Sequence, residues 1–322
     1  MELKKRSCFS ADKLRQFTLL FVLLLLVILF SVLSPYFLQQ SNLMNIMRQV
    51  STNAICAVAM TMIIILGDID LSVGSMLAFL SVIGAKVYNA LPTGLPSAFA
   101  ALLAVMVVGA AIGCISGIIT AKGKIPAFVT TLALMEALRG LANIITGGSP
   151  IPISDSDFKV FGSGWILDMI PVPVVLMILI IVLGIFLMKA TRFGRHLYAI
   201  GGNALASHYS GLHVVRTRVI VFALAGALYG LAAMILAGRL GGGYPATASG
   251  SEMDAIAATI LGGTSMSGGK GSIFGTLIGV LIIGVINVGL TLLDVSTFWQ
   301  QVLMGGIILV AVLLDTKSKS KG

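Results

Sequence analysis

The sequence has very little charge. Only 10% of its 322 residues are charged, whereas 57% are hydrophobic. A soluble domain usually carries about 25% charged residues, so the composition excludes a soluble enzyme, a nucleic-acid-binding protein and a disordered chain. The three cysteines, Cys8, Cys56 and Cys114, are far apart. They form neither a disulfide framework nor a metal-ligand spacing.

A nucleotide-binding loop is also missing. The segment 252–271 (EMDAIAATILGGTSMSGGKG) is rich in glycine, but a phosphate loop requires Gly, four residues and then Gly-Lys-Ser/Thr. Thr264 occupies the position of the first required glycine, and Gly271 follows Lys270. We therefore expect no ATP site in this chain. The spans also contain no histidine–acid or metal-ligand constellation, so we expect no catalytic residue, cofactor or metal.

Long apolar runs dominate the chain instead. A helix needs about 20 apolar residues to cross a bilayer. The first run is expected to remain as a span rather than to be removed as a signal peptide, because no small-residue cleavage site follows it. The candidate spans are 17–34, 50–66, 73–90, 98–119, 128–145, 170–188, 219–237, 255–266, 273–293 and 298–314.

These runs predict an all-α polytopic membrane protein with about ten transmembrane helices. The eighth run is too short to cross alone, so eight complete spans with broken helices is an open alternative. The whole chain, 1–322, is then one membrane domain, with a membrane bundle at 17–314 and tails at 1–16 and 315–322. With both tails in the cytoplasm, 16 of the 21 Lys and Arg residues lie in cytoplasmic segments. This asymmetry is what the positive-inside bias predicts.

Two polar segments interrupt the apolar runs. In the first, 67–74, Asp68, Asp70, Ser72 and Gly74 lie between two candidate spans. Asp70 and Ser72 fit the capping region of the next helix. A role in substrate passage or gating is the alternative, since charges inside a membrane face protein or water.

The second polar segment repeats part of the first. At an offset of 195 residues, six positions of fifteen are identical, which permits an internal repeat of the kind from which transporters are built, although chance would also explain it. The pathway candidates in this second segment are Glu252, Asp254, Gly262, Gly263, Thr264 and Gly269.

The fifth candidate span contains Glu136 and Arg139, which share one helical face. We expect an ion pair between these two side chains or with a partner inside the bundle. Binding of sugar hydroxyls is the more specific alternative.

Glycines recur every four residues in three spans. They allow close helix packing, and a sliding helix interface is the alternative that the sequence leaves open. The sets are Gly109, Gly113 and Gly117; Gly226 and Gly230; and Gly275 and Gly279.

Four motifs together resemble a known family. GDIDLSVGS at 67–75, AKGKIPAFVTTLALMEALRG at 121–140, TRFGRHLYAIGGN at 191–203 and DAIAATILGGTSMSGGKG at 254–271 are similar to motifs of the ribose-type (monosaccharide) ABC importer permeases. The resemblance covers roughly residues 17–316. It implies a type II ABC importer-like fold in the bacterial cytoplasmic membrane, without an ATPase site of its own.

The resemblance also implies partners. These are a second permease copy, a cytoplasmic ATP-binding subunit that binds the ATP, a periplasmic or lipid-anchored sugar-binding protein and the lipid bilayer, but no nucleic acid. The docking loop for the ATPase corresponds to 189–218. Its coupling residues are expected at Gly201, Gly202, Asn203, Ala204, Ala206 and Gly211.

We expect the two glycines of this loop to permit a sharp entry into a short helix, and Asn203 to cap it. Relatives often carry an acidic residue directly after GGN, whereas Ala204 stands there in this chain. This departure loosens the match at the docking contact, and a dedicated ATPase partner is an alternative that the sequence leaves open.

The substrate implied by the resemblance is a monosaccharide, with ribose the leading candidate. The rival reading is a secondary transporter or channel driven by an ion gradient, in which Asp68, Asp70 and Glu136 bind protons or cations.

Overall fold

The computed structural model describes residues 3–319, which form thirteen α-helices and four two-residue strands. The helices are α1 (Leu3–Leu33), α2 (Gln40–Ile65), α3 (Val73–Asn89), α4 (Leu95–Gly123), α5 (Ala127–Thr146), α6 (Ser156–Ser163), α7 (Val172–Ala190), α8 (Arg192–Gly202), α9 (Ala204–Tyr209), α10 (Val214–Leu240), α11 (Ser251–Leu261), α12 (Ile273–Leu292) and α13 (Thr297–Lys319). The strands are β1 (Ile151–Pro152), β2 (Trp165–Ile166), β3 (Ile170–Pro171) and β4 (Gly242–Gly243).

The predicted fold class, an all-α polytopic membrane protein, is confirmed. Within the described part of the chain, seven helices are long and apolar enough to cross a membrane: α1, α2, α4, α5, α7, α10 and α12. α3 and the apolar part of α13, Thr297–Val310, are shorter. The eighth predicted run is α11, whose 11 residues are too few to cross a bilayer, as the sequence indicated. α2 begins at Gln40, ten residues before the expected start of that span.

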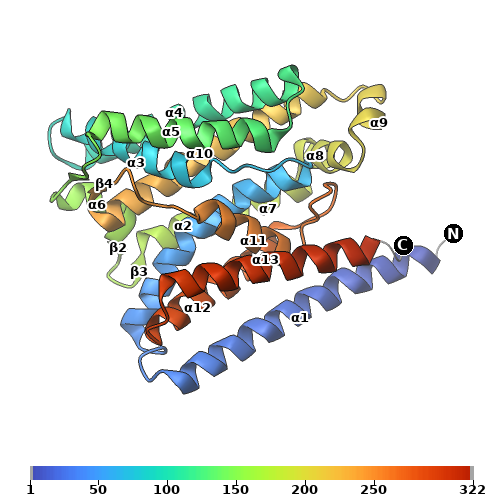
Figure 1. Ribbon diagram of the computed structural model, residues 1–322, viewed down its shortest axis with the longest axis horizontal. Coiled ribbons are helices and arrows are strands. Elements are labelled where there is room, and N and C mark those ends of the chain that lie inside the picture. Colours follow the sequence, from blue (N-terminus) through green and yellow to red (C-terminus); the bar gives the residue numbers. More distant parts are fainter. Residues whose placement is uncertain (1–2, 320–322) are drawn as a thin grey trace.

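The helices form layers around α2. Figure 1 shows α4, α5 and α10 along one side of the molecule and α1, α12 and α13 along the opposite side. α2 is buried along most of its length, whereas α1 exposes large side chains such as Phe17, Phe21 and Val32. A helix that is apolar on every side and exposed in this way fits contact with lipid tails rather than water. α1 is therefore an outer helix and α2 the centre of the bundle.

Close helix packing explains the glycines at four-residue spacing. A Cβ on Gly109 or Gly113 of α4 would overlap the backbone carbonyl of Gly226 or Phe222 on α10. Likewise, a Cβ on Gly275 of α12 would overlap the Gly262 carbonyl at the end of α11. The prediction of close packing at these faces is confirmed, because the backbones approach too closely for any side chain.

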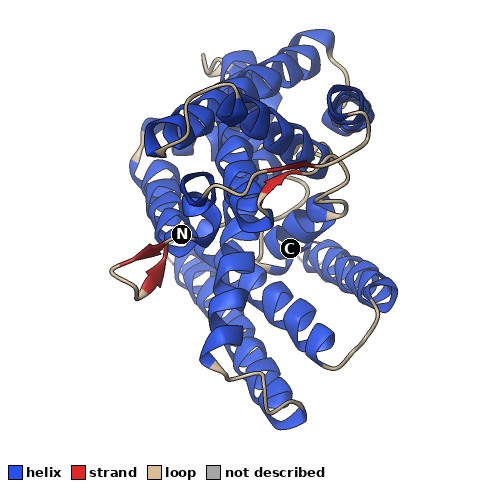
Figure 2. Ribbon diagram, turned by 90° about the vertical axis from the view of Figure 1, so that its left-hand side faces the viewer, coloured by secondary structure: helices blue, strands red, loops and turns tan. Residues whose placement is uncertain are grey.

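The two ends of the bundle differ in structure. The start of α1, the end of α13 and the helices α8 and α9 lie at one end (Figure 1). The opposite end carries α6 and the strands, which face the viewer in Figure 2. There β1 pairs antiparallel with β4, joining Ile151 to Gly243, and β2 pairs antiparallel with β3.

Candidate functional site

The two polar segments predicted from the sequence meet each other. The first is the break between α2 and α3, residues 66–72, and the second is the break between α11 and α12, residues 262–272. The Gly269 amide donates a hydrogen bond of 2.8 Å to the Ile65 carbonyl, the last residue of α2. Gly268 and Gly269 have φ angles of 80° and 72°, which only glycine adopts at no steric cost. The second break is thus shaped to reach the end of α2.

α8 closes over this contact. A Cβ on Gly201 would overlap the Ile65 carbonyl and would lie 2.7 Å from the Gly269 nitrogen. The Tyr198 hydroxyl donates a hydrogen bond of 2.9 Å to the Gly271 carbonyl. Burial raises the pKa of Tyr198, so its phenol stays protonated and able to donate. We call residues 65–68, 198–201, 268–271 and Arg218 the helix-break junction.

An ion pair ties the start of α10 to the first break. Arg218 Nε lies 2.6 Å from Asp68 Oδ2, and Asp68 is buried while Arg218 is partly exposed. Arg218 follows the loop that contains α9, and Gly201 precedes that loop. Both ends of the α9 segment are therefore anchored on the two helix breaks.

The α9 segment itself projects from the molecule. Asn203 Oδ1 accepts a hydrogen bond of 2.9 Å from the Ala206 amide, which confirms the predicted cap of a short helix. Ala204, Ala206 and Gly211 are exposed and, with Leu205 at 65% and Tyr209 at 81% exposure, form a small apolar tip.

One expectation about this segment was wrong. Gly201 and Gly202 do not begin the α9 helix but end α8, because Asn203 already has an extended backbone with φ of −160° and ψ of 100°. The turn into α9 is therefore made at Asn203, and Gly201 serves close packing instead.

A second cluster lies where α3 and α11 begin. Asp70 Oδ1 accepts hydrogen bonds from the Ser72 amide at 2.8 Å and from the Ser72 hydroxyl at 2.6 Å. This confirms that Asp70 satisfies an amide at the start of α3, whereas the Ser72 side chain makes no capping bond of its own. A Cβ on Gly74 would overlap the Ala248 carbonyl and the Glu252 carboxylate. The N-terminal ends of the two short helices thus meet inside the bundle.

The predicted ion pair between Glu136 and Arg139 is absent from the described residues. Arg139 instead donates from Nη1 to the carbonyls of Pro245, at 2.7 Å, and Thr247, at 2.8 Å. The loop before α11 presents these carbonyls to α5, and they satisfy a guanidinium group that would otherwise be unpaired. Glu136 is exposed on α5.

The remaining predicted residues separate into two places. Gly262, Gly263 and Thr264 belong to the second break, where Gly263 has a φ of 98° and Thr264 is buried. Asp254 lies apart from the junction and lines a cavity beside α13. No group of three His, Cys, Asp or Glu side chains within residues 3–319 could hold a metal ion.

Three groups of the junction were not predicted from the sequence: the Ile65 carbonyl, Tyr198 and Arg218. A backbone carbonyl carries no sequence signal. Arg218 counted only as one of many basic residues, because nothing in one sequence pairs it with an aspartate 150 positions earlier.

Comparison with known proteins places the chain among transport permeases. Residues 42–312 match the family model described as "Branched-chain amino acid transport system / permease component". The chain is 43% identical over 305 residues to the ribose import permease protein RbsC of Escherichia coli strain K12, covering 93% of each chain. It is 46% identical over 300 residues to RbsC of Bacillus subtilis strain 168, covering 92% of each.

A sugar permease with another printed substrate is also similar. The L-arabinose ABC transporter permease protein AraH of Azospirillum brasilense is 37% identical over 297 residues, which cover 91% of this chain and 86% of AraH. No solved structure matches significantly. Because the family model matches most of the chain and these relatives match nearly all of it, the chain belongs to this family of membrane permease components of transport systems.

Proposed function

We propose that this chain is the permease subunit of an ABC importer for a monosaccharide, with ribose as the leading substrate. The observation that carries the proposal is the α9 segment, which is exposed at its tip and anchored at both ends on the helix breaks. A partner that moves α9 would move both breaks together. Two of the relatives carry the name ribose import permease, which favours ribose over the branched-chain amino acids of the family description.

The proposed driving subunit is a separate cytoplasmic ATPase, which binds the ATP. Its contact is the coupling segment around Gly201, Gly202, Asn203, Ala204, Ala206 and Gly211. The exposed Leu205 and Tyr209 beside the small residues suit a helix tip inserted into a cleft of another protein. A sugar-binding protein outside the membrane delivers the substrate.

We also propose a second permease copy. Glu136 is exposed on α5, one of the helices long and apolar enough to span a membrane. An ionisable group facing lipid is costly, so such residues face protein or a water-filled path. A pathway between two copies that includes α5 would satisfy Glu136. This pathway, with Asp68, Asp70, Ser72, Gly74, Arg139 and the second break lining or gating it, is part of the proposal.

A labelling experiment tests the proposed orientation, in which both termini and α9 lie in the cytoplasm of a bacterial cell. Ser156 begins α6 and Ser210 follows α9, and both side chains are exposed. The helices α6 and α9 lie at opposite ends of the bundle (Figure 1). In a Cys8→Ser background, an impermeant maleimide should label Ser156→Cys in intact cells, and Ser210→Cys only after the membrane is opened. Labelling of both variants from outside would contradict the orientation.

A competition experiment tests the proposed substrate. Proteoliposomes containing the permease, the ATPase and the binding protein should accumulate labelled ribose. A tenfold excess of unlabelled ribose should lower this uptake about tenfold by mass action, while xylose and arabinose should lower it less and leucine should leave it unchanged. Competition by leucine without ribose transport would replace the sugar with a branched-chain amino acid.

A further inference from the structure

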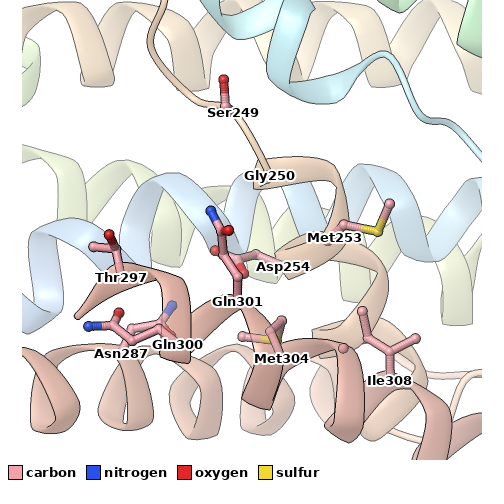
Figure 3. A pocket seen from close by; sticks show the side chains of 11 residues that line it. Ser249, Gly250, Met253, Asp254, Asn287, Thr297, Gln300, Gln301, Met304 and Ile308 are labelled. Atoms are coloured by element: carbon pink, nitrogen blue, oxygen red, sulfur yellow. The ribbon is translucent and has the colours of Figure 1, made fainter. Parts of the chain in front are cut away.

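A cavity with both polar and apolar lining residues lies away from the helix-break junction, between α11, α12 and α13. Its volume is about 450 Å³, within the range of about 300–1,000 Å³ that is usual for small-molecule sites. Figure 3 shows the side chains around it. The polar lining residues are Ser249, Asp254, Asn287, Thr297, Gln300 and Gln301.

Polar side chains at this place need an explanation. Asn287 lies in α12, which is long and apolar enough to span a membrane, and Gln300 and Gln301 lie in the apolar part of α13. Polar groups within a bundle are costly unless protein or water satisfies them. Within the described part of the chain, the side chains of Asp254, Asn287 and Gln301 have no hydrogen-bond partner, whereas Gln300 donates to Thr291 and to the Val295 carbonyl. Three helices thus present unused hydrogen-bonding groups to one cavity.

The chemistry of these groups suits sugar hydroxyls. Each sugar hydroxyl donates one hydrogen bond and accepts others. An amide side chain does both, and a carboxylate accepts. Met253, Met304 and Ile308 supply an apolar wall, which is the usual complement in a small-molecule pocket. None of the described lining residues is Lys, Arg or His, so an anionic group such as the carboxylate of an amino acid would face Asp254 without a counter-charge.

The position fits entry from the outside. The turn between α12 and α13 lies at the end of the bundle opposite α8 and α9 (Figure 1), and Thr297 and Gln300 lie in the first turn of α13. On the other side, Gly250 and Met253 flank Glu252, where α11 meets Gly74 of α3. The cavity therefore lies between the end of the bundle opposite α8 and α9 and the point where α3 and α11 begin.

We infer that this cavity is a binding site for a neutral sugar, occupied after release from the binding protein and before passage to the inner end. The inference rests on the proposed function, because a sugar importer supplies the ligand. It adds a specific site in each permease copy, with Asn287 and Gln301 as specificity-determining residues for a polyhydroxylated substrate.

Substrate protection tests the site with the permease alone in lipid nanodiscs. Ser249→Cys, an almost isosteric change in the cavity wall, is alkylated by a maleimide in a background of Cys8→Ser and Cys114→Ser. Ribose at twice its dissociation constant should slow this alkylation about threefold, because two thirds of the sites are then occupied. Leucine should have no effect. The matched control is Ser156→Cys, which is exposed and lies outside the cavity, and whose alkylation ribose should leave unchanged.

Two further variants locate the sugar. In the Ser249→Cys background, Asn287→Leu and Gln301→Leu should each abolish most of the protection. Gln301 is exposed and leucine is a good helix former, so Gln301→Leu tests the site even if Asn287→Leu fails to fold. Equal alkylation with and without ribose, or protection that survives in Gln301→Leu, would overturn the inference. Because neither ATPase nor binding protein is present, this result is independent of whether ATP-driven uptake succeeds.

Discussion

Replacing Gly201 with alanine is expected to abolish most of the transport, although the change adds one methyl group. The new Cβ would overlap the Ile65 carbonyl and approach the Gly269 nitrogen, both of which are backbone atoms that cannot rotate away. Overpacking of this kind costs about 1–3 kcal/mol. If this strain raises the free energy of the conformation that transports sugar, uptake per molecule should fall about tenfold or more, since about 1.4 kcal/mol corresponds to one factor of ten.

The adjacent glycine provides a matched control. Gly202 is also in α8, but a Cβ on it would have nothing within 4 Å. Alanine is the better helix former by about 1 kcal/mol, so Gly202→Ala should keep normal membrane levels and normal uptake. The measurement is ATP-driven sugar uptake divided by the amount of permease in the membrane, for wild type and both variants.

The comparison also separates folding from coupling. If Gly201→Ala reaches the membrane at normal levels but transports poorly, the junction acts in transport. If its level falls while Gly202→Ala is normal, the junction supports folding. Equal uptake in wild type and both variants would show that close packing of α8 against the helix breaks is not needed for transport. That result would contradict the proposed coupling between α9 and the breaks.

Local features of the fold were predictable from the sequence. Asn203 caps α9 because an asparagine side chain satisfies an amide three residues later, and that geometry depends on adjacent residues alone. The glycine faces of α4, α10 and α12 were predictable for the same reason, since a four-residue spacing places small residues on one side of a helix.

Long-range pairings were not predictable. The spacing of Glu136 and Arg139 indicated an ion pair, but the Pro245 and Thr247 carbonyls, more than 100 residues later, bind Arg139 instead. Arg218 pairs with Asp68 across an even longer separation. Such partners depend on how the helices pack, which helical periodicity does not encode. The internal repeat stays a prediction, although the two segments that suggested it are in contact.

The second large effect concerns the source of energy. If an ATPase drives this permease through α9, the permease alone should move no sugar against a gradient. An ion-gradient carrier would instead need free ionisable groups inside the bundle. Asp68 is already paired with Arg218, and Asp70 accepts two hydrogen bonds from Ser72. Two of the three acidic residues that the rival mechanism requires are therefore engaged in structural contacts.

One reconstitution decides between the two energy sources. Labelled ribose uptake is measured in liposomes that contain the permease alone, under imposed proton or sodium gradients, and in liposomes that also contain the ATPase and the binding protein, with and without ATP. We expect the permease alone to match empty liposomes under every gradient, and accumulation to appear when ATPase, binding protein and ATP are all present. Accumulation by the permease alone, driven by an ion gradient, would contradict the account.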